Sequence, residues 1–282
     1  MKQITTINEM RAEAEKLRLA GKRIGFVPTM GALHEGHLEL IRASVAENDV
    51  TVCSIFVNPT QFNNAEDFRL YPRIEQEDAV MLENARCTYL FLPAAAEMYP
   101  APAKVNFNFG ELETVMEGAH RPGHFNGVAL IVSKLFHVVQ PHKAYFGQKD
   151  LQQYAIIKQL VTDLDFNLNL VRFPIVREKS GLAMSSRNRR LTPEQLEIAP
   201  ELYKTLCLAE EKLQNGSLSE AKSAAEAYLK NYPEIKLEYF EIADANTLQP
   251  LTELKPGHEV ALCLAAFLGE IRLIDNLVLV VK

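Results

Sequence analysis

The segment from Ile24 to Val45 constrains the fold of this chain most strongly. It opens with a short apolar run at residues 24–27, Ile-Gly-Phe-Val, of the kind that forms a buried strand. A loop with two glycines and two histidines follows, which reads Pro28-Thr29-Met30-Gly31-Ala32-Leu33-His34-Glu35-Gly36-His37. Beyond this loop, Leu38, Ile41 and Val45 recur at helical spacing. The pattern predicts a strand, a loop and a helix in that order, which is the repeating unit of α/β proteins.

The loop has the residues that a phosphate chain requires. The first turn of a helix offers unpaired backbone N–H groups and a partial positive charge. Gly31 and Gly36 allow a ligand to approach the backbone, and the side chains of His34 and His37 can donate hydrogen bonds to phosphate oxygens. The segment therefore predicts a nucleotide site.

Other interpretations of this loop fit its spacing less well. A metalloprotease zinc motif has its histidines four residues apart, whereas His34 and His37 are three apart. Gly31 and Gly36 have the spacing of a P-loop, but His37 and Leu38 stand where lysine and serine or threonine are needed. The Gly-x-Gly-x-x-Gly dinucleotide fingerprint does not occur in the chain. A glycine-rich turn with two solvated histidines remains the alternative without a function.

Apolar runs of strand length alternate with helical patterns in the residues that follow. We expect strands at residues 50–57, 88–92, 105–109, 144–146 and 168–173, and helices at residues 128–139 and 150–164. The run 105–109 alternates apolar and polar residues, which is typical of an edge or half-exposed strand. The alternation predicts an α/β fold whose sheet is mostly parallel, with helices on both faces. Ligands of such sheets bind beyond the carboxyl ends of the strands. The loop at 28–37 and residues 58–61 and 146–149 follow expected strands, so we expect them to line one cleft.

The pattern changes near residue 176. Capping boxes at residues 192–195, Thr-Pro-Glu-Gln, and 217–220, Ser-Leu-Ser-Glu, predict two helix starts. Pro193 occupies the first helical position of one of them, and Asn215-Gly216 predicts the end of the helix before the other.

Strand-like runs at residues 237–242, 259–265 and 277–281 follow these helices. We therefore expect one domain at residues 1–176 and a smaller α+β domain at residues 177–282. Its core is expected to contain Leu202, Leu206, Leu213, Tyr228 and Leu229.

Composition excludes several classes of protein. The net charge of −6 and the pI near 5.7 argue against a nucleic-acid partner. The first residues lack an apolar signal region, and no uninterrupted apolar run approaches the ~18 residues of a membrane helix, so we expect a cytoplasmic protein without a membrane contact. Four cysteines form no C-x-x-C pair and are expected to be buried and reduced, namely Cys53, Cys87, Cys207 and Cys263.

The loop resembles the His-x-Gly-His signature of the superfamily of nucleotidylyltransferases and class I aminoacyl-tRNA synthetases. In its longer form it resembles the pantoate–β-alanine ligases, or pantothenate synthetases. Six further blocks carry the resemblance in order along the chain: Ile-Phe-Val-Asn-Pro-Thr-Gln-Phe at 55–62, Tyr-Pro-Arg at 71–73, Arg-Pro-Gly-His-Phe at 121–125, Phe-Gly-Gln-Lys-Asp-Leu-Gln-Gln at 146–153, Met-Ser-Ser-Arg-Asn at 184–188, and Leu-Ile-Asp-Asn at 273–276.

This resemblance implies a Rossmann-like first domain, a C-terminal lid domain and a homodimer. It also implies a reaction of pantothenate biosynthesis in the coenzyme A pathway, in which ATP drives the condensation of (R)-pantoate with β-alanine. Pantoyl adenylate is the intermediate, and pyrophosphate and AMP are released. Two other functions remain as alternatives to this ligase reaction. One is a nucleotidylyltransferase that releases its adenylated product, and the other is a nucleotide-binding regulator without catalysis.

The resemblance also implies the residues of the site. The catalytic residues would be His37, His34 and Lys149. The ATP contacts would be Pro28, Thr29, Met30, Gly31, Ala32, Leu33, His34, Glu35, Gly36, His37, Gly147, Gln148, Lys149, Asp150, Val176, Met184, Ser185, Ser186 and Arg187. Pantoate would bind Gln61 and Gln153, with Asn58 and Arg121 as secondary contacts.

Two features of the later blocks bear on the chemistry. Lys149 follows a glycine at a strand end and brings a flexible cation. The block at 184–188 resembles the Lys-Met-Ser-Lys-Ser loop of class I synthetases without its lysines, so Arg187 is the cation there, and Gly181 would allow it to move as a lid. The phosphate chain requires Mg²⁺, bound largely through ATP oxygens and water. Sequence does not choose among four carboxylates near these blocks, Glu77, Asp78, Glu117 and Asp150.

Overall fold

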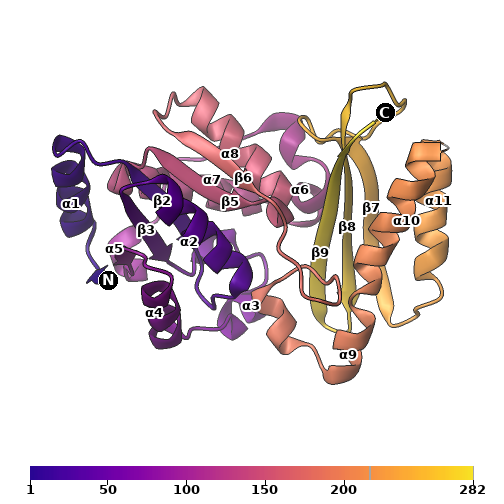
Figure 1. The fold of residues 1–282 in the computed structure, drawn as a ribbon, viewed down its shortest axis with the longest axis horizontal. Helices are drawn as coiled ribbons and strands as arrows, with labels where there is room; N and C mark the ends of the chain where they lie inside the picture. Colours follow the sequence, from indigo (N-terminus) through magenta and orange to yellow (C-terminus); the bar gives the residue numbers. More distant parts are fainter. Residues whose placement is uncertain (216, 282) are drawn as a thin grey trace. The chain divides into compact units, whose positions relative to one another are not determined.

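A computed structural model describes residues 1–215 and 217–281 and divides into two compact units (Figure 1). The first unit contains Met1–Phe109, His120–Gly147 and Ile156–Pro174. The second unit contains Gly110–Ala119, Gln148–Ala155 and the described chain from Ile175 onwards. Of the first 176 residues, the two internal segments 110–119 and 148–155, together with Ile175 and Val176, therefore belong to the second unit.

The first unit is built on a six-stranded parallel sheet of order β1-β4-β3-β2-β5-β6. Its strands are β1 (Lys2–Ile4), β2 (Ile24–Thr29), β3 (Val50–Ile55), β4 (Tyr89–Phe91), β5 (Lys143–Gly147) and β6 (Asn169–Phe173). The helices of this part of the chain are α1 (Ile7–Leu19), α2 (Glu35–Glu47), α3 (Ala65–Leu70), α4 (Glu75–Asn84), α5 (Ala95–Met98), α7 (His124–Val139) and α8 (Leu151–Asp163). The predicted parallel sheet is confirmed.

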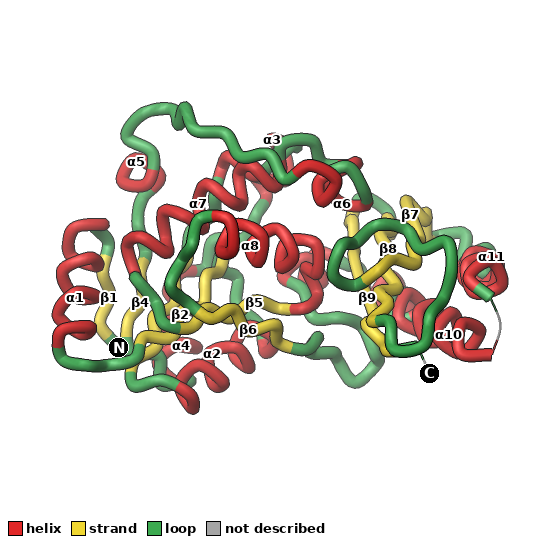
Figure 2. Tube along the Cα trace, turned by 90° about the horizontal axis from the view of Figure 1, so that it is seen from above, coloured by secondary structure: helices red, strands yellow, loops and turns green. Residues whose placement is uncertain are grey.

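Helices cover both faces of this sheet because alternate side chains of each strand point to opposite faces (Figure 2). Phe26 of β2 meets Phe136 of α7 edge to face, with ring centroids 6.4 Å apart. The next residue, Val27, packs on the other face in a cluster with Ile41 of α2 and Leu82 of α4. The first unit is thus a three-layer structure with one buried core on each side of the sheet.

The order of the strands changes direction at β2. The chain continues from β2 to β3 on one side, whereas β5 lies on the other side. Pairing between β2 and β5 ends at Phe26 and Ala144, two residues before Pro28, which has no N–H to donate. Open α/β sheets bind their ligands at such a switch point, beyond the carboxyl ends of the strands.

The second unit has a three-stranded antiparallel sheet of β7 (Ile235–Asp244), β8 (Glu259–Leu268) and β9 (Ile271–Val280). Its helices are α6 (Met116–His120), α9 (Pro193–Ile198), α10 (Glu201–Asn215) and α11 (Leu218–Leu229). Four short 3-10 helices complete the described chain, η1 (Pro59–Gln61), η2 (Gly110–Glu113), η3 (Gln148–Asp150) and η4 (Ser186–Arg190).

The core of the second unit lies between the sheet and helices α10 and α11. Both predicted capping boxes are present and begin α9 and α11, and Pro193 occupies the first turn of α9. The predicted core leucines are buried there, namely Leu202, Leu206, Leu213 and Leu229. Tyr228 is only half-buried, and its hydroxyl donates a hydrogen bond to Glu201 at 2.6 Å. Gly216, predicted to end a helix, lies outside the described residues.

The predicted strand at residues 105–109 is wrong. The backbone there is irregular, and the Phe107 N–H donates to the Asn126 side chain of α7 at 2.8 Å. A segment of alternating apolar and polar residues forms a strand only when a neighbouring strand accepts its backbone hydrogen bonds. Here the Asn126 side chain of α7 accepts the Phe107 N–H instead. The short strand β1 was not predicted at all.

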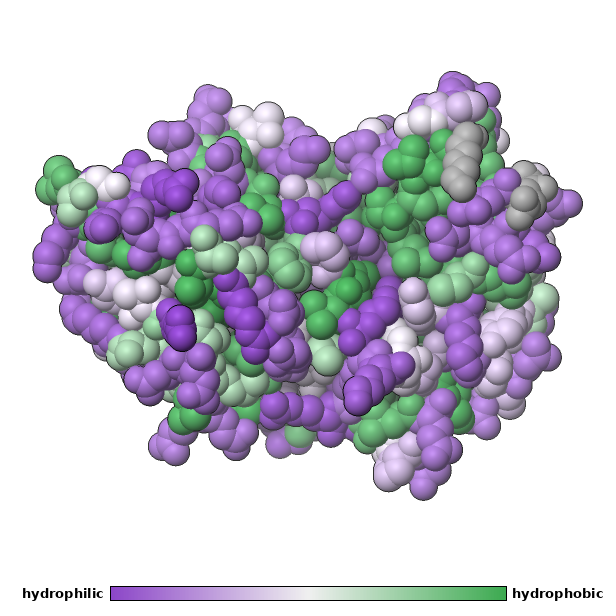
Figure 3. All heavy atoms as spheres, in the orientation of Figure 1, coloured by the Kyte–Doolittle hydropathy of each residue, from purple (hydrophilic) through white to green (hydrophobic). Residues whose placement is uncertain are grey.

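The face of the molecule shown in Figure 3 is mostly hydrophilic, and three of the four cysteines are buried as expected. Hydrophilic side chains cover most of each unit there, and hydrophobic ones form scattered patches (Figure 3). Cys53, Cys87 and Cys263 are buried, Cys207 is half-buried, and all four are free thiols. Burial raises the pKa of Cys87 and of Cys263 to about 12. In the part of the chain that the structure describes, no helix combines the length and the apolar character needed to cross a membrane.

Candidate functional site

The loop between β2 and α2 is held by a buried carboxylate. Asp78 of α4 is fully buried and accepts the backbone N–H groups of Ala32 at 2.8 Å and Leu33 at 2.7 Å. These charge-assisted bonds stabilise a conformation with positive φ at two successive residues, +79° at Gly31 and +50° at Ala32. A Cβ at Gly31 would lie 2.9 Å from the Ile55 side chain, so only glycine fits there.

The two histidines of the loop lie side by side at the start of α2. The His34 backbone N–H donates to Nδ1 of His37 at 3.3 Å, and the ring centroids are 4.0 Å apart. Because Nδ1 of His37 accepts this bond, its hydrogen resides on Nε2. Both side chains are half-buried. His37 therefore has an Nε2–H donor at a helix N-terminus, where a phosphate group is favoured.

Gln61 lies beside this loop. Its Nε2 is 3.1 Å from Sδ of Met30, and its Oε1 accepts from Nδ2 of Asn58 at 3.1 Å. Asn58 is only 1% exposed and uses both ends of its amide within the protein. Nδ2 also donates to the Gly127 carbonyl at 3.0 Å, and Oδ1 accepts from the Tyr99 hydroxyl at 2.9 Å. Asn58 thus orients the Gln61 amide.

Helix α7 fixes the turn that bears Gln61. Gly127 lets α7 approach closely, because a Cβ there would lie 2.3 Å from the Thr60 carbonyl oxygen. Nδ1 of His124 lies 2.8 Å from the Gln61 carbonyl oxygen, and Arg121 reaches the same oxygen at 3.5 Å. Within the first unit, the structure therefore brings together the predicted loop 28–37, Asn58, Gln61 and Arg121.

The predicted residues of the second unit lie on two segments. Lys149 belongs to η3 and is half-buried, and Gln153 lies in the first turn of α8. Val176 and Met184 lie opposite each other, because the Met184 N–H donates to the Val176 carbonyl at 3.0 Å. Ser185 caps η4 by accepting the Arg187 N–H at 3.2 Å.

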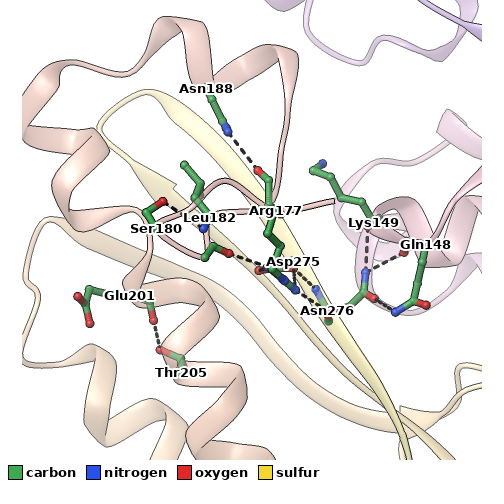
Figure 4. A network of polar contacts seen from close by, with 12 residues as sticks. Gln148, Lys149, Arg177, Ser180, Leu182, Asn188, Glu201, Thr205, Asp275 and Asn276 are labelled. Atoms are coloured by element: carbon green, nitrogen blue, oxygen red, sulfur yellow. Dashed lines mark hydrogen bonds and ion pairs between the residues drawn. The ribbon is translucent and has the colours of Figure 1, made fainter. Parts of the chain in front are cut away.

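Strand β9 contacts both of these segments (Figure 4). Asn276 donates to the carbonyl oxygens of Gln148 and Lys149, each at 3.0 Å. Asp275 accepts two hydrogen bonds from Arg177, at 2.6 and 2.9 Å. Burial raises the pKa of Asp275, and the Arg177 guanidinium acts in the opposite direction.

The candidate metal carboxylates differ in their surroundings. Asp78 binds the loop, and Glu117 accepts from Arg272 at 2.6 and 2.8 Å and from the Tyr239 hydroxyl at 3.0 Å. Glu77 and Asp150 are exposed. Among the residues that the structure describes, no three His, Cys, Asp or Glu side chains are grouped so that they could hold a metal ion.

Sequence reasoning missed the role of Asp78 as the anchor of the loop. A signal was present, since Asp78 lies one helical turn before Leu82, on the apolar face of α4. A carboxylate on a buried helix face needs donors.

Comparison with known proteins decides which family has this loop and this fold. Residues 2–278 match the family described as pantoate-beta-alanine ligase. The chain belongs to the pantoate–β-alanine ligase family. Within this family, it is 48% identical over 279 residues to the pantothenate synthetase of Cytophaga hutchinsonii, with 98% of this chain and 99% of the relative covered. It is 49% identical over 277 residues to that of Bacteroides thetaiotaomicron, with 98% of each chain covered.

Solved structures of the family have the same fold. The pantothenate synthetase of Thermus thermophilus matches with a TM-score of 0.92 at 43% identity and covers 98% of this chain and 99% of its own. The pantoate-beta-alanine ligase of Francisella tularensis, complexed with beta-gamma ATP and beta-alanine, matches with a TM-score of 0.82 at 36% identity. That match covers 98% of this chain and 97% of the other.

Proposed function

We propose that this chain condenses (R)-pantoate with β-alanine at the expense of ATP, as a step of pantothenate biosynthesis. Membership of the ligase family supports the reaction class, and the Francisella relative is described with an ATP compound and β-alanine. The observation that carries the proposal is the His34–His37 pair at the N-terminus of α2, on a loop anchored by Asp78 and next to Gln61.

The first half-reaction forms pantoyl adenylate. A carboxylate oxygen of pantoate attacks the α-phosphorus of ATP, the bond from that phosphorus to the β-phosphate oxygen breaks, and pyrophosphate leaves. Negative charge grows on the phosphate oxygens, so preorganised donors account for most of the catalysis. We assign this role to the imidazoles of His37 and His34 and to the ammonium group of Lys149.

The second half-reaction forms the amide. The amine of β-alanine attacks the acyl carbon, the carbon–oxygen bond to AMP breaks, and the amine loses a proton. In this proposal Gln61 and Gln153 bind pantoate, because amides pair with hydroxyl and carboxylate groups without adding charge. Asn58 acts by orienting the Gln61 amide, and Arg121 acts next to the Gln61 carbonyl.

The remaining assignments concern ATP. We propose that residues 28–37, 147–150, 176 and 184–187 contact it, with Arg187 as a cation for the phosphates. Gly181, three residues before Met184, has a φ of +96°, a conformation that favours glycine. Residues 184–188, with the rest of the domain at 177–282, would exclude water from the adenylate, a mixed anhydride that hydrolysis destroys.

Mg²⁺ would enter with ATP. In this proposal phosphate oxygens and water hold the ion, and Glu77 or Asp150, which are both exposed, is an outer partner. When bound, the ion neutralises charge on the phosphate chain. A homodimer in the cytoplasm completes the proposal, and sedimentation of the purified protein tests the dimer.

The decisive experiment follows ¹⁸O from pantoate labelled in both carboxylate oxygens. With ATP, Mg²⁺ and pantoate alone, we expect pyrophosphate in an amount close to that of the enzyme and little free AMP. Addition of β-alanine should then release AMP that has one ¹⁸O in its phosphate, together with pantothenate. Label in inorganic phosphate with ADP as the co-product would show an acyl phosphate and refute the mechanism. Without β-alanine, pyrophosphate far in excess of the enzyme, together with free adenylated product, would instead favour a simple nucleotidylyltransferase.

A further inference from the structure

The block Leu-Ile-Asp-Asn at residues 273–276 has no role in the proposed chemistry, yet its two polar residues are buried. Asp275 is 4% exposed and Asn276 is 3% exposed. Both lie in β9, opposite Leu264 and Cys263 of β8. Burying an amide and a carboxylate among apolar residues costs free energy unless each polar atom has a partner. The partners of these side chains therefore indicate what the block does.

The Asn276 side chain binds the backbone of the turn that contains Lys149. Its Nδ2 donates one hydrogen to the Gln148 carbonyl and the other to the Lys149 carbonyl, each at 3.0 Å. Its Oδ1 accepts from Nε2 of Gln148 at 3.3 Å. Both donor hydrogens and the acceptor of the amide are thus used on two successive residues.

The neighbouring residue extends the same network. Asp275 accepts the Asn276 backbone N–H at 2.8 Å and pairs with Arg177. Arg177 in turn donates to the Gly181 carbonyl at 3.1 Å and lies over the Tyr203 ring at 3.7 Å from its centroid. The network therefore holds β9 in one conformation behind the Asn276 amide.

These hydrogen bonds set the position of the Lys149 Cα and the direction in which its side chain leaves the backbone. Bonds to two successive carbonyl groups fix the peptide planes on either side of the Lys149 Cα, and with them the direction of its Cα–Cβ bond. In Figure 4 the carbonyl of Lys149 faces Asn276, whereas its side chain extends away from the network. A flexible lysine stabilises developing charge only if its backbone is held in place before the reaction.

We propose that Asn276 is a positioning residue, which sets the backbone of Gln148 and Lys149 so that the Lys149 ammonium group reaches the phosphates. This inference rests on the proposed function, which gives Lys149 its place at ATP. In this proposal Asn276 makes no contact with ATP, pantoate or β-alanine. In the adenylation step it acts through Lys149.

A double-mutant cycle tests this role. Asn276→Ala and Lys149→Ala are made singly and together, and single-turnover pyrophosphate release is measured with ATP, Mg²⁺ and pantoate. We expect Asn276→Ala to slow this step about tenfold or more in the native background. In the Lys149→Ala background the same change should alter the rate by less than about twofold, because the group it positions is gone.

Two further variants separate positioning from general stability. Asn276→Thr keeps a strand-forming residue of similar size without the amide, and it should reproduce the effect of Asn276→Ala. Asn231→Ala removes an exposed asparagine of the same unit that donates to the Tyr228 carbonyl, and it should leave the rate unchanged. Equal slowing by Asn276→Ala in both Lys149 backgrounds would overturn the inference. Failure of both Asn276 variants to fold would also overturn it, since the residue would then be needed for folding.

Calorimetry then measures the ATP affinity of the same four proteins, namely wild type, the two single variants and the double variant. These affinities test the positioning role even if the proposed reaction does not occur. A wild-type protein that binds ATP but forms no adenylate refutes the function. Coupling between Asn276 and Lys149 in ATP binding would still support the positioning role in that case, and additive losses of affinity would overturn it.

Discussion

The carboxylate of Asp78 accepts the backbone N–H of Leu33 at 2.7 Å, across 45 residues of sequence. Together with its bond to Ala32, this contact ties α4 to the loop that leads into the first turn of α2. The carboxylate has no solvent exposure, so water cannot replace it as an acceptor for these two N–H groups. The geometry of His34 and His37 therefore depends on a residue of another helix.

Replacement of Asp78 by Asn keeps the size of the side chain but places an amide NH₂ group against backbone donors. An unpaired buried donor costs about 1–3 kcal/mol of stability, and the loop should shift with it. We expect Asp78→Asn to lower the midpoint of thermal unfolding and to slow adenylation. Glu83→Gln, an exposed change on the same helix, is the control. Wild-type adenylation by Asp78→Asn would show that the loop does not need this anchor.

Replacement of His37 by Ala tests the charge-stabilising role of the imidazole. Loss of one preorganised donor typically costs about 3 kcal/mol, which is a hundredfold or more in rate. We expect single-turnover adenylation to fall by that factor and ATP affinity to change far less. His137→Ala, which removes an exposed histidine of α7, should have neither effect. Adenylation by His37→Ala within about threefold of wild type would remove His37 from the mechanism.

Replacement of Gln61 or Gln153 by Ala should weaken pantoate binding and leave ATP affinity nearly unchanged. The physical reason is that the proposed amide contacts lie on the acid and not on the nucleotide. Calorimetric titration with each ligand measures both affinities. Gln159→Ala is a matched control, since Gln159 lies on α8 like Gln153 but pairs with Asp163 on the exposed face. A selective loss of ATP binding would place these glutamines in the wrong part of the site.

Acid pH should release a contact between α2 and β5. Lys143 and Tyr145 donate to Glu47 at 2.8 and 2.9 Å and lower the pKa of that carboxyl below its ordinary 4.5. A lowered pKa in the folded state adds stability above the unfolded value, and this stability is lost as the pH falls through the folded value. The difference in unfolding midpoint between wild type and Glu47→Gln should therefore be largest near neutral pH and shrink below about pH 4.5. A difference that stays constant with pH would exclude an ionised Glu47 from this contact.

Several local elements could be predicted because short-range physics decides them. The boxes that begin α9 and α11 need only residues three apart, and both are present in the structure. The apolar helix predicted at 128–139 lies within α7, whose sequence is apolar on nearly all sides. The strand expected at 105–109 failed because a strand depends on a partner, and the pattern contained no information about that partner.

By itself, the sequence determined the alternation of strands and helices, the loop with His34 and His37, and the family to which those blocks belong. Each of these depends on residue types at short spacing, which is visible along the chain. Only the tertiary structure decided that Asp78 anchors the loop and that Asn276 holds the Lys149 backbone from 127 residues away. A buried polar side chain must find a partner, but packing and strand register choose that partner, and neither is set by local periodicity.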